Sequence, residues 1–151
     1  MRRPASARCA STGTDGRPPC TPHRAIPFQA LVHAQPPHLT YLSHIPACRT
    51  TQALNSRILR WEREAIVSLP EGVVVLGFMV PGSAGLQAAT AEGLREAQVV
   101  LWSKHGVMAR SDLSVAHAVD RIEYAETGAR YECMDLVAGR DAGRSMANGG
   151  R

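Results

Sequence analysis

The stretch QVVLWSKHGVMA, residues 98–109, is typical of two β-strands joined by a tight turn. Apolar residues fill its first half, a polar Ser-Lys-His-Gly segment interrupts it, and apolar residues resume after Gly106. We expect the turn at His105 and Gly106, because glycine lets the backbone bend sharply. The imidazole of His105 would then stand at the end of an apolar strand and point beyond the sheet edge.

The segments before this hairpin also alternate between strand and helix patterns. Residues 65–78, AIVSLPEGVVVLGF, contain two runs rich in Val and Ile, so we expect two strands around a turn at 70–72. A helix should follow Ser83, whose hydroxyl suits an N-cap position, with Leu86, Ala89 and Leu94 on one side. Strand and helix therefore alternate up to the hairpin.

The ends of the patterned region extend this alternation. Residues 28–33, FQALVH, read as a short and largely buried strand, and helices are expected over 36–44, from its two prolines, and over 50–61. The longest helix is expected over about 112–138, capped by Ser111 or Asp112. Its apolar stripe would be Leu113, Ala116, Ile122, Ala125, Ala129 and Leu136. Interleaved strands and helices predict an α/β fold with helices layered on a sheet.

Composition and charge exclude several classes of protein. The 151 residues, 44% apolar and 5% aromatic, are enough for one globular domain. The formal net charge of +4 comes entirely from residues 1–24, which hold five arginines and one aspartate, so the rest of the chain is neutral and gives no support for nucleic-acid binding. The longest apolar run, residues 73–80, is too short to span a bilayer, which argues against a membrane protein.

Domain boundaries and cysteine usage follow from the same composition. Residues 1–24 are rich in Arg, Ser, Thr, Gly and Pro, and we expect a disordered basic tail there, a domain over 25–140 and a flexible tail over 141–151. The four cysteines, with no C-x-x-C pair, favour free thiols in a reducing, cytoplasmic compartment. They are Cys9, Cys20, Cys48 and Cys133.

Two histidines stand at the ends of predicted strands. His33 and Gln35 are two residues apart, so on a strand their side chains would point the same way and could converge on one metal ion. Histidines at the ends of neighbouring strands, here His33 and His105, can assemble a site at a sheet edge. The alternatives are a strand-end His33 satisfied by backbone groups and a turn His105 exposed to water.

Four blocks of this sequence resemble the class II aldolase/adducin family, and within it the branch that cleaves rhamnulose 1-phosphate. The resemblance covers about two thirds of the chain, with the blocks in the family's order and spacing. The blocks are VHAQPPHLTYLSHIP (32–46), NSRILRWEREAIVSLPEGVVVLGFMVPGS (55–83), VVLWSKHGVMARSD (99–112) and RIEYAETGARYE (121–132).

This resemblance implies a fold, a cofactor and a reaction. The fold would be the layered α/β/α sheet of the class II aldolases. A divalent zinc ion would be bound by His33, Gln35 and His105, and a small phosphorylated ketose would be cleaved to dihydroxyacetone phosphate and lactaldehyde. Glu64 falls on a catalytic carboxylate that reaches a neighbouring subunit's site in a homotetramer; the alternative for Glu64 is a solvated surface acid.

The sequence departs from the family pattern at two places. Gln35 replaces the second histidine of the family's H-x-H pair; His38 is an alternative third ligand, disfavoured because a first helical turn would point it elsewhere. No residue of 1–30 matches the family's phosphate-binding loops or main acid/base glutamate, so we expect an incomplete domain with impaired activity. Alternative functions are a non-catalytic adducin-like binding or assembly module and a pentulose-phosphate epimerase.

Overall fold

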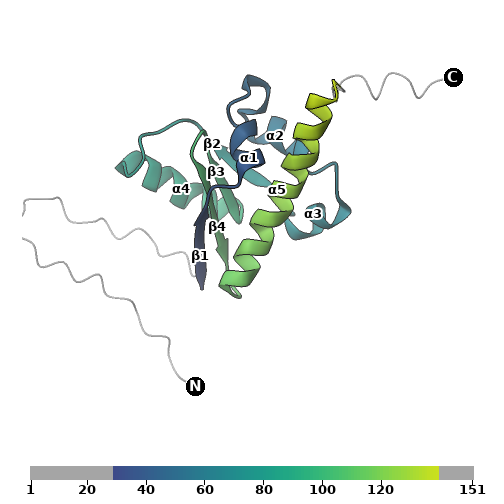
Figure 1. Cartoon of the computed structure of the whole chain (residues 1–151). Coiled ribbons are helices and arrows are strands. Elements are labelled where there is room, and N and C mark those ends of the chain that lie inside the picture. The colour runs from purple at the N-terminus through teal and green to yellow at the C-terminus, as the bar shows by residue number, and fades with distance from the viewer. Residues whose placement is uncertain (1–28, 140–151) are drawn as a thin grey trace, which may run out of the picture.

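The structure is a computed structural model that describes residues 29–139. Our expectations for the tails at 1–24 and 141–151 lie outside these residues. Within them, a four-stranded mixed sheet has the order β1-β4-β3-β2, with β1 antiparallel to β4, β4 antiparallel to β3, and β3 parallel to β2 (Figure 1). The strands are β1 (Ala30–Ala34), β2 (Val73–Leu76), β3 (Val99–Trp102) and β4 (Gly106–Ser111).

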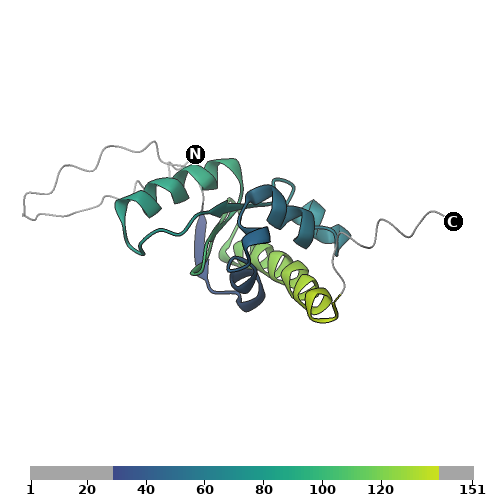
Figure 2. The same ribbon diagram turned by 90° about the horizontal axis from the view of Figure 1, so that it is seen from above.

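Helices cover both faces of this sheet. Helix α4 lies on one face, over β2 and β3, while α1, α2 and α5 lie on the other (Figure 2). The predicted layered α/β/α fold is therefore confirmed. The helices are α1 (Pro37–Leu42), the 3₁₀ turn η1 (Pro46–Cys48), α2 (Thr51–Ile58), α3 (Arg63–Ser68), α4 (Ala84–Glu96) and α5 (Val115–Val137).

The helix caps agree with the sequence for α4 but not for α5. The Ser83 hydroxyl accepts a hydrogen bond from the Leu86 amide at 3.1 Å, as an N-cap should. For α5 the N-cap is Ser114, so the prediction of Ser111 or Asp112 was wrong. The Ser111 side chain is buried at the end of β4, where its hydroxyl accepts the Leu113 amide at 3.0 Å and shapes the turn that precedes the helix.

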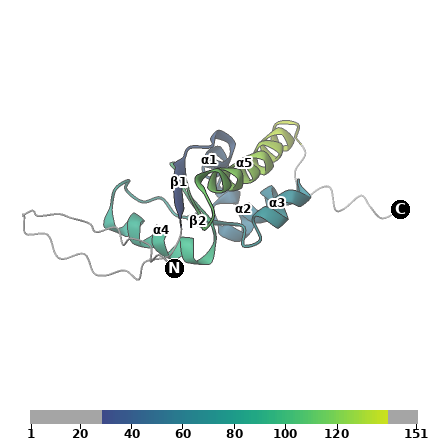
Figure 3. The same ribbon diagram turned by 90° about the horizontal axis from the view of Figure 1, so that it is seen from below.

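One predicted strand was also wrong, because residues 63–68 form α3. In this segment Ala65 and Leu69 are buried, whereas Ile66 and Val67 are 56% and 80% exposed. In a strand Val67 would share the inward face of Ala65 and Leu69, so its exposure excludes a strand, whereas two inward positions four residues apart fit a helix. A short apolar run cannot distinguish the two by composition. The buried side of α3 faces α5, which packs beside it (Figure 3).

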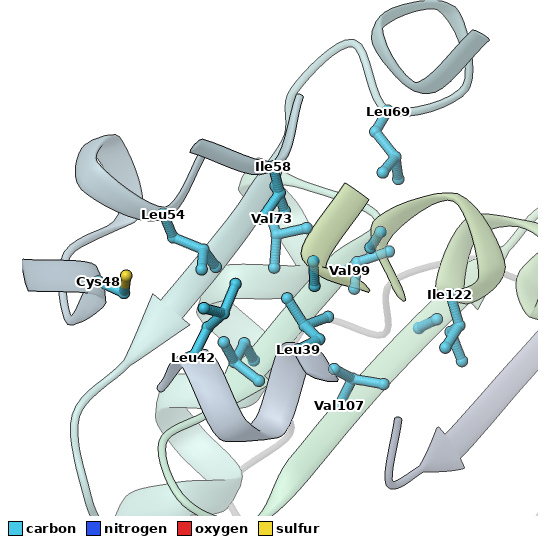
Figure 4. Packing of buried hydrophobic residues seen from close by; sticks show 14 of the residues in the cluster. Leu39, Leu42, Cys48, Leu54, Ile58, Leu69, Val73, Val99, Val107 and Ile122 are labelled. Carbon is cyan, nitrogen blue, oxygen red and sulfur yellow. The ribbon is translucent and has the colours of Figure 1, made fainter. Parts of the chain in front are cut away.

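The main core lies between the sheet and the layer of α1, α2 and α5 (Figure 4). Close packing here depends on a glycine in α5: a Cβ atom at Gly128 would lie 2.3 Å from the Ile58 carbonyl oxygen. Helix α5 therefore meets the end of α2 at backbone distance. The core side chains are Leu39, Leu42, Leu54, Ile58, Leu69, Val73, Val99, Leu101, Val107, Ala109, Ala118, Ile122, Ala125 and Ala129, with Cys48.

Strand β1 is less buried than its sequence predicted. Ala30 is buried, but Leu31 is 47% exposed and His33 is also exposed. Among residues 29–139, β1 is the last strand on its side of the sheet, and α4 covers the opposite end. The side of β1 that carries Leu31 and His33 therefore faces solvent.

A buried carboxylate joins α2 to α5. The Glu132 side chain is 1% exposed and accepts hydrogen bonds from Arg57 Nη1 at 2.7 Å, Arg60 Nη2 at 2.8 Å and Trp61 Nε1 at 3.2 Å. Two guanidinium groups and an indole thus compensate the loss of its hydration. Removing only the carboxylate would take away the buried charge that Arg57 and Arg60, themselves 21% and 31% exposed, share between α2 and α5.

We expect Glu132→Ala to destabilise the protein by about 3–5 kcal/mol, the usual cost of removing one partner of a buried ion pair. Urea unfolding followed by circular dichroism measures this free energy. The matched control is Glu123→Ala, an exposed position on the same helix, where a change within about 0.5 kcal/mol is expected. Equal effects of the two substitutions would contradict the structural role of Glu132.

The two described cysteines, Cys48 and Cys133, are free thiols within the helical layer. Burial, together with the neighbouring carboxylates of Glu126 and Glu132, raises the pKa of Cys133 to about 11. Burial also raises the pKa of Cys48. Because the thiolate is the reactive form, these cysteines are inert structural residues near neutral pH.

At pH 8 the folded chain should alkylate slowly at Cys133. A pKa two units above 9.0 lowers the thiolate fraction by about 100-fold relative to the unfolded chain. Iodoacetamide labelling, resolved by peptide mass spectrometry, compares the native protein with the protein in urea. The same labelling rate in both samples would disprove this pKa shift.

Candidate metal and active site

The structure brings His33 and His105 together at one end of the sheet. Their ring centroids lie 5.3 Å apart, with the ring planes at 74°. His33 faces Met108 in the β1–β4 register, and His105 directly precedes the first residue of β4. Two histidines that are seventy-two positions apart in sequence are thus neighbours, because β1 and β4 pair.

The backbone fixes the protonation pattern of His33. Its Nδ1 lies 2.8 Å from the Val107 carbonyl oxygen, which can only accept, so Nδ1 carries the proton and donates. In the neutral imidazole the other ring nitrogen, Nε2, then has the lone pair. Metal-binding histidines show this arrangement, in which one nitrogen donates to a carbonyl and the other faces the ion.

His105 has an unsatisfied nitrogen. Its Nδ1 is buried and has no hydrogen-bond partner among residues 29–139. Two imidazoles that bind one zinc ion tetrahedrally, at about 2.1 Å through one nitrogen each, have ring centroids about 5 Å apart. The observed 5.3 Å agrees with this separation, so the spacing of the two rings is compatible with a shared metal ion.

The loop before β4 is held from both sides, which fixes His105. The Lys104 amide donates to the Ser43 hydroxyl at 2.7 Å, and the Ser103 hydroxyl donates to the Leu76 carbonyl at 2.6 Å. The sharp bend lies at Lys104, which has a φ of 64°, and not at Gly106 as the sequence suggested. Lysine tolerates this left-handed conformation here because these two hydrogen bonds hold the loop.

Gly106 instead allows close approach between β1 and β4. A Cβ atom at this position would lie 2.6 Å from the Ala34 carbonyl oxygen, 3.1 Å from Gln35 Cγ and 3.2 Å from His33 Cε1. Any larger residue would push the end of β1 away from β4. The same distances place the Gln35 side chain next to His33, on the rim of the site.

Trp102 completes the wall of the site and was missed by the sequence analysis. Its ring centroid lies 4.8 Å from that of His33 and 5.0 Å from that of His105. The available signal was strand alternation: Trp102 pairs with Gly106, so its side chain is on the face where glycine leaves space.

The other sequence candidates lie apart from this pair. His38, at the start of α1, hydrogen-bonds through Nδ1 to Glu126 of α5 at 2.7 Å. Glu64 is exposed on α3, which packs against α5. Among residues 29–139, no three side chains of His, Cys, Asp or Glu lie close enough together to hold a metal ion. A metal bound by the two histidines therefore needs a further donor, for which Gln35 is the adjacent candidate.

Comparison with known proteins places this chain in a family. The model of the class II aldolase and adducin N-terminal domain matches residues 20–133. The chain belongs to this family. The match confirms the resemblance seen in the four sequence blocks, and it begins within the segment 1–24 that was expected to be a tail.

Individual relatives of this class II aldolase/adducin chain are sugar-phosphate aldolases. A rhamnulose-1-phosphate aldolase from Yersinia pestis (strain Pestoides F) is 33% identical over 113 residues, which make up 74% of this chain and 40% of the relative. A sugar-phosphate aldolase from Thermotoga maritima superposes with a TM-score of 0.67 at 32% identity, covering 76% of this chain and 47% of that one.

A more distant structure shows the shared fold alone. The l-fuculose-1-phosphate aldolase from Thermus thermophilus superposes with a TM-score of 0.60 at 22% identity, covering 74% of this chain and 55% of that one. The chain therefore spans about 40% of the length of the curated relatives and about half that of the solved structures. Within residues 29–139, none of the helices has the length and apolar character needed to cross a membrane.

Gly106→Ala should destabilise the protein by about 1–3 kcal/mol, because the added methyl group overlaps the backbone of Ala34. Thermal unfolding measures the change. Gly77→Ala is the matched control, since a Cβ at Gly77 meets nothing within 4 Å. A Gly106→Ala protein as stable as Gly77→Ala would contradict the close approach of β1 and β4.

Proposed function

We propose that this chain provides the metal-binding part of a zinc-dependent class II aldolase whose substrate is a ketose 1-phosphate, specifically rhamnulose 1-phosphate. The observation that carries the proposal is the histidine pair, with one free nitrogen on His33 and one unsatisfied nitrogen on His105, at a separation that suits one zinc ion. The Yersinia relative, named a rhamnulose-1-phosphate aldolase, supports the choice of substrate.

Each residue of the site would have its own role in binding the metal ion. His33 and His105 would supply nitrogen ligands, and the side-chain oxygen of Gln35 would supply a weaker neutral ligand. When bound, zinc supplies a positive charge that stabilises the negative charge developing on the substrate oxygens during carbon–carbon cleavage. The hydrogen bond from His33 to Val107 would keep the imidazole oriented toward the ion.

Proton transfer would need a carboxylate from outside the histidine pair. Glu64 is exposed on α3 and is free to reach a second copy of the chain. We assign this role to Glu64 in a homotetramer with sites between subunits. Cleavage of rhamnulose 1-phosphate would release dihydroxyacetone phosphate and lactaldehyde.

A non-catalytic binding or assembly module of the adducin type is the second candidate. Gln35 favours it, because an amide in place of an imidazole weakens zinc binding. The position of β1 favours it as well, because β1 is an edge strand among residues 29–139 and an open strand edge is a ready surface for association. The two candidates differ in whether the chain binds zinc through its histidines.

His105→Ala and His33→Ala should each weaken zinc binding by more than about 100-fold, since loss of a direct ligand costs more than the 10–100-fold that follows loss of an outer partner. Gln35→His should tighten it, because imidazole is a better zinc ligand than an amide. Isothermal titration with zinc measures the affinities, and a coupled assay for dihydroxyacetone phosphate measures cleavage.

His44→Ala is the control for these variants, because His44 is exposed beyond the end of α1. It should bind zinc as the original chain does. If His33→Ala and His105→Ala also leave zinc binding unchanged, the histidine site is wrong. Stable oligomers that bind neither zinc nor ketose phosphate would instead favour the assembly module.

A further inference from the structure

We propose that Trp102 is a positioning residue that fixes the two imidazoles of the site, and that Thr90 on α4 anchors its indole. The inference rests on the proposed metal-binding function and extends it to a residue of β3. No chemical step is assigned to Trp102 itself. Its role is to hold His33 and His105 in the arrangement that a single metal ion requires.

The sheet geometry lets one indole contact both imidazoles. Trp102 on β3 faces Gly106 on β4, and β4 in turn pairs with β1, which carries His33. A side chain at Gly106 would stand between Trp102 and His33. Because glycine has none, the indole and the imidazole approach to a centroid distance of 4.8 Å across the intervening strand.

A hydrogen-bond chain from α4 fixes the indole in turn. The Trp102 Nε1–H donates to Thr90 Oγ1 at 2.9 Å, and that hydroxyl donates to the Leu86 carbonyl at 2.6 Å. The Thr90 hydroxyl has one proton, which the Leu86 carbonyl accepts, so its lone pairs are available to the indole. Thr90 is 8% exposed, so water competes little for this hydrogen bond.

The imidazoles need such a support because the site is at the rim of the sheet. His33 is exposed, and it lies on β1, which among residues 29–139 is the last strand on its side of the sheet. The indole lies tilted by 33° against His33 and by 42° against His105. One fixed aromatic surface thus limits the rotation of both rings and lowers the entropy that they lose on binding a metal ion.

Three variants of the full chain test this role. Trp102→Leu removes the aromatic surface, Trp102→Phe keeps a ring but loses the link to Thr90, and Thr90→Val removes the anchor while keeping its shape. Trp61→Phe is the control, since Trp61 contacts Glu132 and lies outside the site. Zinc affinity by titration and the visible spectrum of bound cobalt(II) are measured on protein shown to be folded by circular dichroism.

Trp102→Leu should weaken zinc binding by about 10–100-fold, the range found when outer partners of metal ligands are removed. Trp102→Phe and Thr90→Val should weaken it less, and each should alter the cobalt spectrum. Trp61→Phe should leave both unchanged. If folded Trp102→Leu binds zinc with the original affinity and spectrum, the proposal is overturned. If Trp102→Leu does not fold, Trp102→Phe and Thr90→Val decide in the same way.

A metal-free measurement separates this inference from the proposed function. In the NMR spectrum of the original chain, the ring protons of His33 and His105 should be shifted by the ring current of Trp102, with assignments from His33→Ala and His105→Ala. Trp102→Leu should remove these shifts, and Thr90→Val should change them. If the original chain binds no zinc but Trp102→Leu removes the ring-current shifts, the metal function fails and the positioning role stands. If the shifts are unchanged in Trp102→Leu, the positioning role is overturned.

Discussion

Helix α5 lies in direct backbone contact with α2 at Gly128 and Ile58, and the rest of the structure depends on this contact. It brings two α5 carboxylates to their partners on α1 and on the α2 segment. Glu132 neutralises arginines of the α2 segment, and Glu126 accepts the amide hydrogens of His38 and Leu39 at 3.0 and 2.9 Å. Since Pro36 has no side-chain cap to offer, Glu126 acts as the N-terminal cap of α1.

The contacts of α5 extend through α1 to the histidine pair. Once α1 is fixed, Ser43 at its end accepts the amide of Lys104, and this hydrogen bond shapes the loop that carries His105. On the other face of the sheet, α4 fixes Trp102 through Thr90. Helices from both layers therefore determine where the imidazoles stand, although both histidines belong to the sheet and its loop.

The site combines two histidines held in place by their neighbours with a rim that is exposed to solvent. Val107 orients His33, and the unsatisfied nitrogen of His105 leaves a buried polar group that a metal ion would satisfy. Under the proposed function, Gln35 at the rim is the departure from the family pattern that would most affect metal affinity. The two proposed functions differ in zinc affinity. Gln35 as a weaker third ligand would lower this affinity, and the preorganised histidine pair would raise it.

The sequence by itself determined the class of fold, most helices and strands, and which histidines are the candidate metal ligands. Valine-rich runs at 73–76 and 99–102 predicted β2 and β3, Ser83 predicted the start of α4, and the strand-end positions of His33 and His105 indicated a shared site. These features follow from local propensity, capping and alternation. Tertiary structure alone decided that residues 63–68 are helical, that β1 is exposed, that Lys104 makes the bend, and that Trp102 reaches His33 across Gly106. Each of these depends on contacts between segments far apart in the chain, which the strand or helix pattern within one segment does not specify.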